Sequence, residues 1–240
     1  MVHHFALYVR ARDRITEVPP LTLLPYSHQR PKPYIYTDEE ITRLIAAAKA
    51  LPCRKDFRGS TYSTLFSLIW VTGLRISEAL GLDREDVNCA NHLLTIHNAK
   101  FGKSRLIPVH LSTSNALAHY ARYRDQVFPD IQLPSFFLST IGTRPTTAIA
   151  QLTFRQLCSK IGIRDTSRGE RPRIHDMRHS FAVKSLIEIY KRNQDVEQAV
   201  YALSCYMGHV GPSSTYWYFS AVPELLELAS NRLERKRGNL

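Results

Sequence analysis

Cysteine is scarce in this sequence, and its few copies stand far apart. The 240 residues contain four cysteines: Cys53, Cys89, Cys158 and Cys205. No two of them have the short spacing of zinc ligands, which argues against a zinc finger. Isolated cysteines in a chain of this size are typical of reduced thiols and not of a disulfide framework. We therefore expect no metal site and no disulfide scaffold.

Long hydrophobic runs are also lacking. The longest apolar stretch, Thr64 to Leu74, is far shorter than the ~20 residues that a membrane-spanning helix needs. The opening residues, MVHHFALYVRARDR, contain no apolar core like that of a signal peptide. We therefore expect a cytoplasmic protein that has no membrane partner.

Acidic residues are outnumbered by basic ones. The chain has 32 Lys and Arg against 21 Asp and Glu, a formal charge of +11. Such an excess favours a polyanionic partner, most commonly nucleic acid, although a ribosomal protein or an ordinary basic surface would show the same balance. The hydrophobic fraction of 44% is enough for one large globular domain.

Prolines mark a boundary near the N-terminus. They recur from Pro19 to Pro33, in PPLTLLPYSHQRPKP, a composition that disfavours regular helix and predicts an extended linker. The ~18 residues before this linker are too few to fold alone. We therefore divide the chain into a short N-terminal helix with its linker, residues 1–33, and a main domain, residues 34–240, which ends in a helix and basic tail over 223–240.

Helical periodicity dominates the main domain. A capping box formed by Thr37 and Glu40 starts the first helix. Apolar residues at helical spacing predict the later helices. These span residues 61–72, 112–127, 176–192 and 196–207, and a last helix begins at Pro223.

The remaining regular structure is a small sheet. Residues 92–98 and 105–111 are predicted to form two strands joined by a hairpin loop over 99–104, which contains a glycine. Residues 136–138 predict a third short strand. The predicted fold class is therefore mainly α with a small antiparallel β-sheet (α+β).

The stretch RIHDMRHSFA, residues 173–182, carries the first candidate site. At a helix start, His175 and Arg178 share one face, with Cβ atoms roughly 5–6 Å apart. A guanidinium cation binds phosphate oxygens, and an imidazole beside it can take or give a proton. The pair suits chemistry at an anionic phosphorus centre, although a basic helix start that touches solvent or a carboxylate would look the same.

Three other places supply side chains that complete such a site. They are Arg75 with Glu78 at the start of a short helix, Lys100 with Lys103 on the hairpin, and His209 with Tyr218, nine residues apart, after a glycine-capped helix. No Walker-type phosphate loop accompanies them, so we expect no cofactor.

Four motifs together resemble the tyrosine recombinases, also called phage integrases. TGLRISEAL resembles the first arginine box of that family, and HDMRHSFA resembles its His-x-x-Arg box. MGHVGPSSTYWY resembles its Gly-His box with the following tyrosine, and AKFGKSRLIP resembles its lysine-bearing β-turn. The motifs follow the family's order over about residues 34–225, and their combination is specific although each alone is weak.

The resemblance implies a site-specific DNA recombinase or integrase that works through a 3′-phosphotyrosyl intermediate. The implied catalytic residues are Arg75, Lys100, His175, Arg178, His209 and Tyr218. Tyr218 would be the nucleophile, and the two arginines would hold the non-bridging oxygens of the scissile phosphate. A tyrosine of pKa ~10 is neutral at pH 7 and needs help to lose its proton.

The other three implied roles concern protons and hydrogen bonds. His175 would assist proton transfer to or from the tyrosine, Lys100 would protonate the leaving 5′-oxygen, and His209 would donate to the phosphate. Lys103 is the alternative to Lys100, and Tyr216 is the alternative nucleophile. We expect Tyr216 to be structural, because two residues along a helix it points well away from Tyr218.

Two neighbours of the implied site are expected to support it. Glu78 is expected to support Arg75 or a neighbouring helix and not to act as a base. His179 fits a hydrogen-bonding partner of the catalytic residues better than a catalytic group. Trp217 and Phe219 are expected in the core.

The resemblance also implies the partners, double-stranded DNA and further copies of the chain or related recombinases, such as a tetramer on DNA, in the nucleoid. Candidate DNA contacts are Lys103, Arg144, Arg155, Arg171 and Arg173. Only about 33 residues precede the main domain, and the opening HHFALYVRARDR resembles the end of the last helix of the family's N-terminal DNA-binding domain. Two alternatives therefore stay open: a truncated, non-catalytic DNA-binding or regulatory remnant, and a type IB topoisomerase-like relaxing enzyme.

Overall fold

A computed structural model describes most of the chain. The described residues are 2–20, 23, 33–52, 57–99, 103–163, 172–192, 195–208 and 213–238. The chain divides into two compact units, Met1–Lys32 and Pro33–Leu240. In the first unit, helix α1 spans Val2–Arg10, and the Arg12 guanidinium lies 4.7 Å from the centre of the Tyr8 ring. No described helix is long and apolar enough to cross a membrane.

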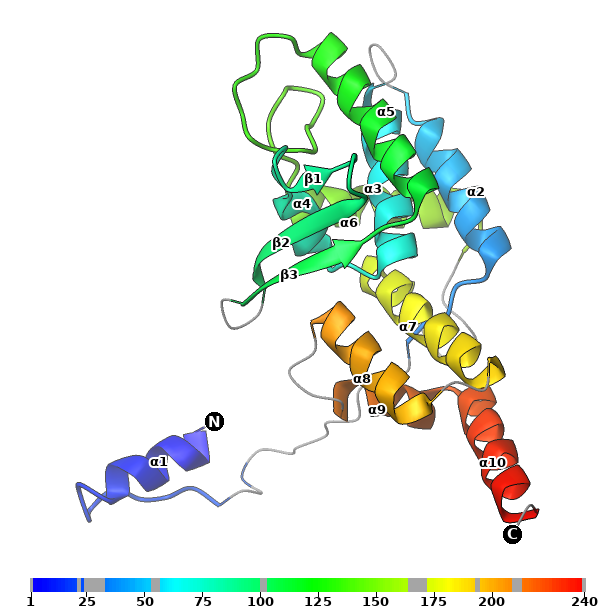
Figure 1. Cartoon of the computed structure of the whole chain (residues 1–240). Helices are drawn as coiled ribbons and strands as arrows, with labels where there is room; N and C mark the ends of the chain where they lie inside the picture. The colour runs from blue at the N-terminus through cyan, green and yellow to red at the C-terminus, as the bar shows by residue number, and fades with distance from the viewer. Residues whose placement is uncertain are drawn as a thin grey trace. The chain divides into compact units, whose positions relative to one another are not determined.

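The second unit is mainly helical around one small sheet (Figure 1), which confirms the predicted fold class. Its described helices are α2 (Asp38–Lys49), α3 (Phe57–Thr72), α4 (Ile76–Gly81), α5 (Leu111–Val127), α6 (Thr147–Lys160), α7 (Ile174–Lys191), α8 (Val196–Met207), α9 (Ser213–Ala221) and α10 (Pro223–Gly238). Its described strands are β1 (Val87–Asn88), β2 (Leu93–Ala99) and β3 (Lys103–Pro108).

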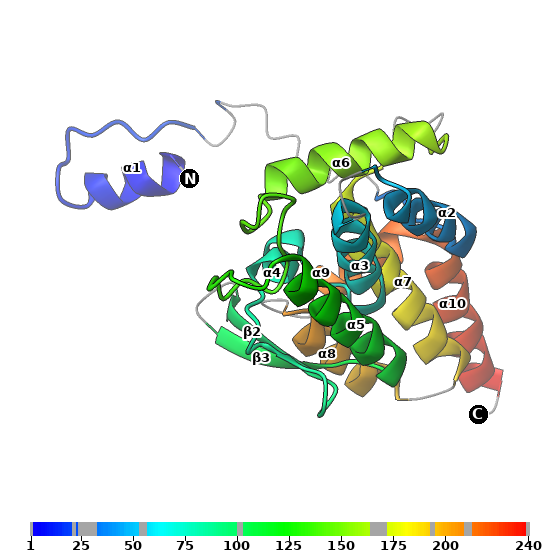
Figure 2. The same cartoon turned by 90° about the horizontal axis from the view of Figure 1, so that it is seen from above.

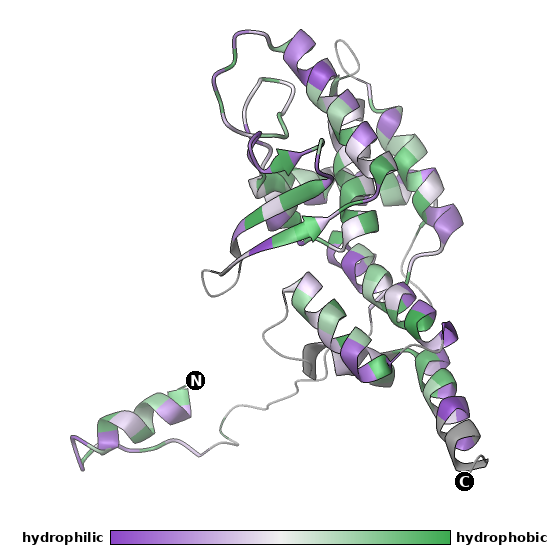
Figure 3. Cartoon of the chain, viewed as in Figure 1, coloured by the Kyte–Doolittle hydropathy of each residue, from purple (hydrophilic) through white to green (hydrophobic). Residues whose placement is uncertain are grey.

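Local signals in the sequence explain where the first long helices begin. The Thr37 side chain accepts from the Glu40 N–H, and the Glu40 carboxylate accepts from the Thr37 N–H, so the predicted capping box is present at α2. Helix α3 is buried over much of its surface and lies against α2, α5 and α7, while Ser60, Thr64 and Ser67 on one side are partly exposed. Figure 3 shows hydrophobic and pale residues on α3, and both hydrophobic and hydrophilic residues on α2 and α5.

The sheet is antiparallel with strand order β1-β2-β3. Leu94 pairs with Ile107 in the middle of the hairpin, and both side chains are buried. The register shifts between Ile96 and Ala99, close to the hairpin loop, and Ala99 then pairs with Lys103. A bulge of this kind twists the end of a hairpin and re-aims the side chains near its tip.

The prediction of a third strand at residues 136–138 is wrong, because the third strand is β1. Phe136, Phe137 and Leu138 are buried, but as a core-filling loop. The Phe136 N–H donates to the Leu82 carbonyl at 2.9 Å, and the Leu138 N–H donates to the Tyr120 hydroxyl at 3.1 Å. These partners satisfy the backbone without a strand ladder, so a short apolar run is not diagnostic of a strand.

Two hydrophobic clusters build the second unit, and α7 belongs to both. Ile174 and Met177, at its start, pack in the larger cluster with α2 to α6 and the sheet. Val183 and Leu186, further along, pack in the smaller cluster with α8, α9 and α10. Figures 1 and 2 show α7 reaching from the sheet-bearing part to the helices of the C-terminal part. The His175–Arg178 motif therefore lies where the two clusters meet.

Candidate active site

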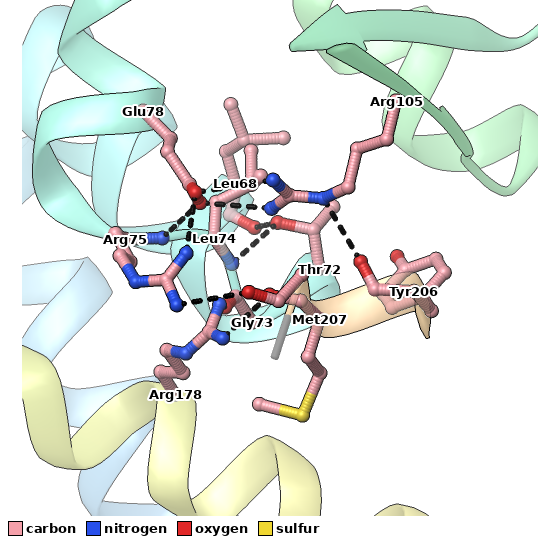
Figure 4. Close-up of polar contacts among 11 residues, drawn as sticks. Leu68, Thr72, Gly73, Leu74, Arg75, Glu78, Arg105, Arg178, Tyr206 and Met207 are labelled. Carbon is pink, nitrogen blue, oxygen red and sulfur yellow. Dashed lines mark hydrogen bonds and ion pairs between the residues drawn. The ribbon is translucent and has the colours of Figure 1, made fainter. Parts of the chain in front are cut away.

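Arg75 is held at the start of α4 by the acid that the sequence pairs with it. The Arg75 backbone N–H donates to Glu78 Oε2 at 2.9 Å, and Arg75 Nη1 donates to Glu78 Oε1 at 2.7 Å. Arg75 Nη2 donates to the Gly208 carbonyl at 3.2 Å (Figure 4). The side chain stays partly open to solvent, so an anion can reach it. The prediction that Glu78 buttresses Arg75 is confirmed.

Arg105, on β3, completes this ion-pair cluster. It donates to both oxygens of Glu78, at 3.1 Å from Nη1 and 2.9 Å from Nη2, while its Nε donates to the Tyr206 carbonyl at 3.0 Å (Figure 4). Burial raises the pKa of Glu78, but the hydrogen bonds from Arg105 and Arg75 outweigh burial and hold the pKa below its ordinary value. Glu78 is therefore an anion at neutral pH, and both of its oxygens are occupied by donors from Arg75 and Arg105.

Arg178, the second arginine of the predicted clamp, is almost fully buried, with 2% of its surface exposed. Its Nη1 donates to the Gly73 carbonyl and its Nη2 to the Met207 carbonyl, both at 2.6 Å. Burial, together with the Arg75 charge, lowers the pKa of Arg178 to about 10. At pH 7 the guanidinium remains charged, because its pKa stays well above the solution pH.

The two arginines converge at the C-terminal end of α8. Arg178 donates to the carbonyl of Met207, and Arg75 donates to the carbonyl of the next residue, Gly208. The arginines are far apart in sequence and come from different helices, yet their guanidinium groups meet at neighbouring peptide units (Figure 4). Gly208 ends α8 in the left-handed conformation, φ 65°, as a C-capping glycine does.

His175 lies one helical turn before Arg178 on α7, and part of its side chain is exposed to solvent. Burial of the rest of its ring lowers the pKa of His175 to about 4, and the charges of Arg178, Arg173 and Arg75 act in the same direction. A pKa of 4 means that the ring is neutral at pH 7. It then has one N–H donor and one lone-pair acceptor.

Tyr218, on α9, is buried in the smaller cluster with 2% of its surface exposed. Its hydroxyl lies 2.8 Å from His179 Nδ1. The His179 ring in turn lies edge-on against His175, with 4.6 Å between ring centroids. The predicted hydrogen-bonding role of His179 is confirmed, and its partner is the tyrosine hydroxyl.

Tyr216 and Tyr218 differ sharply although they share α9. Tyr216 is exposed by 51%, and its ring lies near Phe219. Trp217 and Phe219 pack as partly buried residues against the smaller cluster, as expected.

Several of the predicted site residues lie outside the described part of the chain. Lys100, His209 and Arg171 lie outside the described residues, and Lys103 is described only for its backbone, as the first residue of β3. Of the other candidate DNA contacts, Arg144 donates to the Leu80 carbonyl at 2.6 Å and pairs with Asp83. Arg155 is exposed on α6. DNA contact by these residues remains a prediction.

Arg173, at the start of α7, forms an ion pair with an acidic residue in the first turn of the same helix. It caps α7, and its Nη2 pairs with Asp176 Oδ1 at 3.0 Å. Its backbone carbonyl accepts from the Tyr36 hydroxyl at 3.1 Å. About half of its side chain is still exposed, which leaves it accessible to a phosphate.

Arg105 has no predicted role. The motif that contains it, AKFGKSRLIP, predicts only the hairpin lysines. The available signal is the strand register, because Arg105 is two residues before the buried Ile107 and so shares its face of the strand. The partners of Arg105 could not be predicted, because Glu78 and Tyr206 come from distant parts of the chain.

Among the described residues, no three His, Cys, Asp or Glu side chains gather as a metal site.

Comparison with known proteins settles the family. Residues 35–224 match the Phage integrase family over most of the chain. The chain belongs to the phage integrase family. It is a tyrosine recombinase, an enzyme that breaks and rejoins DNA.

Named relatives agree with this assignment. A protein of Sinorhizobium fredii, y4rB, named as an integrase/recombinase, is 42% identical over 98% of this chain and 76% of its own length. A second such protein of the same organism, y4rE, is 35% identical over 97% of this chain and 74% of its own length. Tyrosine recombinase XerC of Azotobacter vinelandii is 27% identical over 98% of this chain and 73% of its own length.

Solved structures share the fold. The integrase of transposon Tn1549, solved in complex with transposon right end DNA, has a TM-score of 0.68 at 20% identity, and the match covers 95% of this chain and 75% of that chain. The XerA recombinase has a TM-score of 0.64 at 20% identity, over 94% of this chain and 72% of that chain. At this identity the similarity shows that the catalytic-domain fold is the same.

Proposed function

We propose that this tyrosine recombinase cleaves DNA by attack of the Tyr218 hydroxyl on a phosphodiester. The tyrosine O–P bond forms as the bond from phosphorus to the 5′-oxygen breaks. Tyr218 loses its proton, and the leaving 5′-oxygen gains one. The product is a 3′-phosphotyrosyl link and a free 5′-hydroxyl, and attack by a 5′-hydroxyl of another strand reverses the step and rejoins DNA without ATP.

The convergence of Arg75 and Arg178 carries this proposal. Two fixed guanidinium groups at one place match the non-bridging oxygens of a phosphodiester, and their hydrogen bonds to Glu78 and to backbone carbonyls orient them before DNA arrives. The transition state carries more negative charge than the diester. Preorganised donors stabilise that difference, and loss of one such donor typically costs about 3–4 kcal/mol in the barrier.

The proton steps complete the proposed reaction. Lys100 protonates the leaving oxygen, with Lys103 as the alternative acid, and His209 donates a hydrogen bond to the phosphate. His175 assists at the phosphate or at the tyrosine as a neutral imidazole, since its pKa of about 4 leaves it uncharged at pH 7. An approaching phosphodiester anion raises that pKa, because it favours the protonated ring.

We further propose double-stranded DNA as the substrate and a homo-oligomer as the working form, bound to chromosomal DNA in the cytoplasm. The formal charge of +11 suits a polyanionic partner. A lambda integrase tetramer bound to a Holliday junction shares the fold, with a TM-score of 0.64 at 16% identity. That complex supports the oligomer by analogy of fold.

Covalent trapping tests the proposal. The protein is mixed with nicked duplexes taken from DNA that flanks its gene, and a denaturant-stable, protease-sensitive adduct is measured. We expect an adduct with the wild type and with Tyr216→Phe, and none with Tyr218→Phe. An adduct that survives Tyr218→Phe moves the nucleophile elsewhere. Binding without any adduct, even when an intact related recombinase is added, favours the non-catalytic alternative, and sequence-independent relaxation of plasmid favours a topoisomerase-like enzyme.

A further inference from the structure

The His179 side chain contacts the Tyr218 hydroxyl in this structure. Its Nδ1 lies 2.8 Å from the hydroxyl oxygen, within ordinary hydrogen-bond distance. The two rings lie 5.5 Å apart between centroids at an interplanar angle of 64°. Tyr218 is 2% exposed, so water has little access to its hydroxyl.

The position of His179 on α7 places this contact beside the phosphate clamp. His179 follows Arg178 directly and lies one helical turn after His175, so the three side chains share one side of the helix. The rings of His175 and His179 touch, with centroids 4.6 Å apart. A proton that leaves Tyr218 toward His179 therefore moves within the cluster that binds the phosphate.

We infer that His179 is a catalytic residue that holds the Tyr218 oxygen and takes its proton during attack on DNA. The inference rests on the proposed role of Tyr218 as the nucleophile. In the step, the tyrosine O–H bond breaks, and its proton binds His179 Nδ1 as the tyrosine oxygen binds phosphorus. In religation the proton returns from the imidazolium to the tyrosine oxygen, so His179 is regenerated in each cycle.

His175 is less suited to this task than His179. Burial and three neighbouring guanidinium groups lower the pKa of His175 to about 4, which makes its neutral ring a weak base at pH 7. His179 has the aromatic rings of His175, Tyr218 and Trp217 around it. It also has the geometry that a general base requires, a direct contact of about 2.6–3.2 Å with the proton donor.

Asparagine and glutamine variants separate holding from proton transfer. In His179→Asn the side-chain amide occupies the place of Nδ1 and can still hydrogen-bond to Tyr218, but it cannot take up a proton. His179→Gln places its amide nearer to Nε2. The rate of adduct formation in a single turnover on nicked duplex is measured from pH 6 to 9, with DNA affinity and thermal unfolding measured on the same proteins. His119→Asn, an exposed histidine on α5, is the matched control.

We expect His179→Asn to bind DNA as the wild type does and to form adduct about 10²-fold more slowly at pH 7. Its rate should rise about tenfold per pH unit, because deprotonation of tyrosine then depends on hydroxide, whereas His119→Asn should match the wild type. A wild-type rate and pH profile in His179→Asn would overturn the inference and leave a holding role. A faster rate would also overturn it, because His179 would then restrain the tyrosine.

A second measurement is independent of cleavage. The ¹⁵N signals of the His179 ring are compared between the wild type and Tyr218→Phe. We expect Nδ1 to be the unprotonated acceptor in the wild type and its signal to shift when the tyrosine hydroxyl is removed. Unchanged signals contradict the inference even if the protein proves inactive, whereas an adduct that survives Tyr218→Phe contradicts the proposed function itself.

Discussion

The Arg105 guanidinium on β3 and the Glu78 carboxylate on α4 form a two-pronged ion pair, with N–O distances of 3.1 and 2.9 Å. Glu78 in turn binds Arg75 through both its backbone and its side chain. The pair therefore connects the hairpin strand to the first arginine of the phosphate clamp. Arg105 also holds the Tyr206 carbonyl near the end of α8, so one side chain fixes three parts of the site.

Arg105→Ala should weaken both stability and catalysis. Loss of hydrogen bonds to a buried charged group typically costs about 1.5–3 kcal/mol, and Arg75 would lose the support of a fixed Glu78. We expect thermal unfolding at lower temperature and slower adduct formation. Arg192→Ala removes an exposed pair with Glu188 and should change stability by less than about 1 kcal/mol. Equal effects of the two variants would contradict the role assigned to Arg105.

Gly208→Ala should disturb the clamp more than a comparable glycine change elsewhere. A Cβ at Gly208 would lie 2.9 Å from Arg105 Nη1, and the backbone has a positive φ of 65°. Gly162 also has a positive φ, 78°, but a Cβ there would meet nothing within 4 Å. Both alanine variants should lose about 1–2 kcal/mol from the left-handed backbone. Gly208→Ala should in addition lose adduct formation, measured in a single turnover, and equal activities would contradict the account.

Titration of His175 tests the electrostatics of the site. In the DNA-free protein, NMR of the ring should give a pKa of about 4, and Arg75→Gln should raise it. Between about pH 4 and 6.5 the folded protein then binds fewer protons at His175 than the unfolded chain does. The free energy of unfolding therefore falls as the pH falls through this range, and the His175 contribution to stability is fully present above pH 6.5. A titration midpoint near pH 6.5 in the folded protein would contradict the expected effects of burial and of the neighbouring arginines on the pKa of His175.

Local sequence signals predicted much of this molecule. The capping box of α2 and the glycine at the end of α8 could be predicted, because each depends on a few adjacent residues. The contact between Arg75 and Glu78 could be predicted from their spacing for the same reason. The order of the motifs predicted that Arg75 and Arg178 share one site, because it indicated a family whose fold places them together.

The remaining features depend on long-range contacts that no local pattern contains. Residues 136–138 are as apolar as a strand, but their backbone partners, Leu82 and Tyr120, lie in other elements. Arg105 meets Glu78 and Tyr206 only after the hairpin folds onto α4 and α8. The His179–Tyr218 hydrogen bond likewise needs α9 to pack on α7, so spacing alone could suggest a partner for Tyr218 but could not choose between His175 and His179.

The hairpin lysines can be distinguished by their chemistry. Lys100→Met should slow cleavage of ordinary DNA by about 10²-fold or more, because the leaving 5′-oxygen would lack its acid. A duplex with sulfur in place of that 5′-oxygen needs no acid, so it should restore the rate of Lys100→Met. Lys103→Met should have a smaller defect that sulfur does not restore. The opposite pattern would assign the acid to Lys103.

The identity of the nucleophile is the central claim, and peptide mapping of the covalent adduct tests it most directly. The adduct is digested, and tandem mass spectrometry locates the tyrosine that carries the nucleotide phosphate. We predict Tyr218, although it is 2% exposed in the DNA-free protein, and no modification of Tyr216, which is 51% exposed. A phosphate on Tyr216, or on any other tyrosine, would contradict the account.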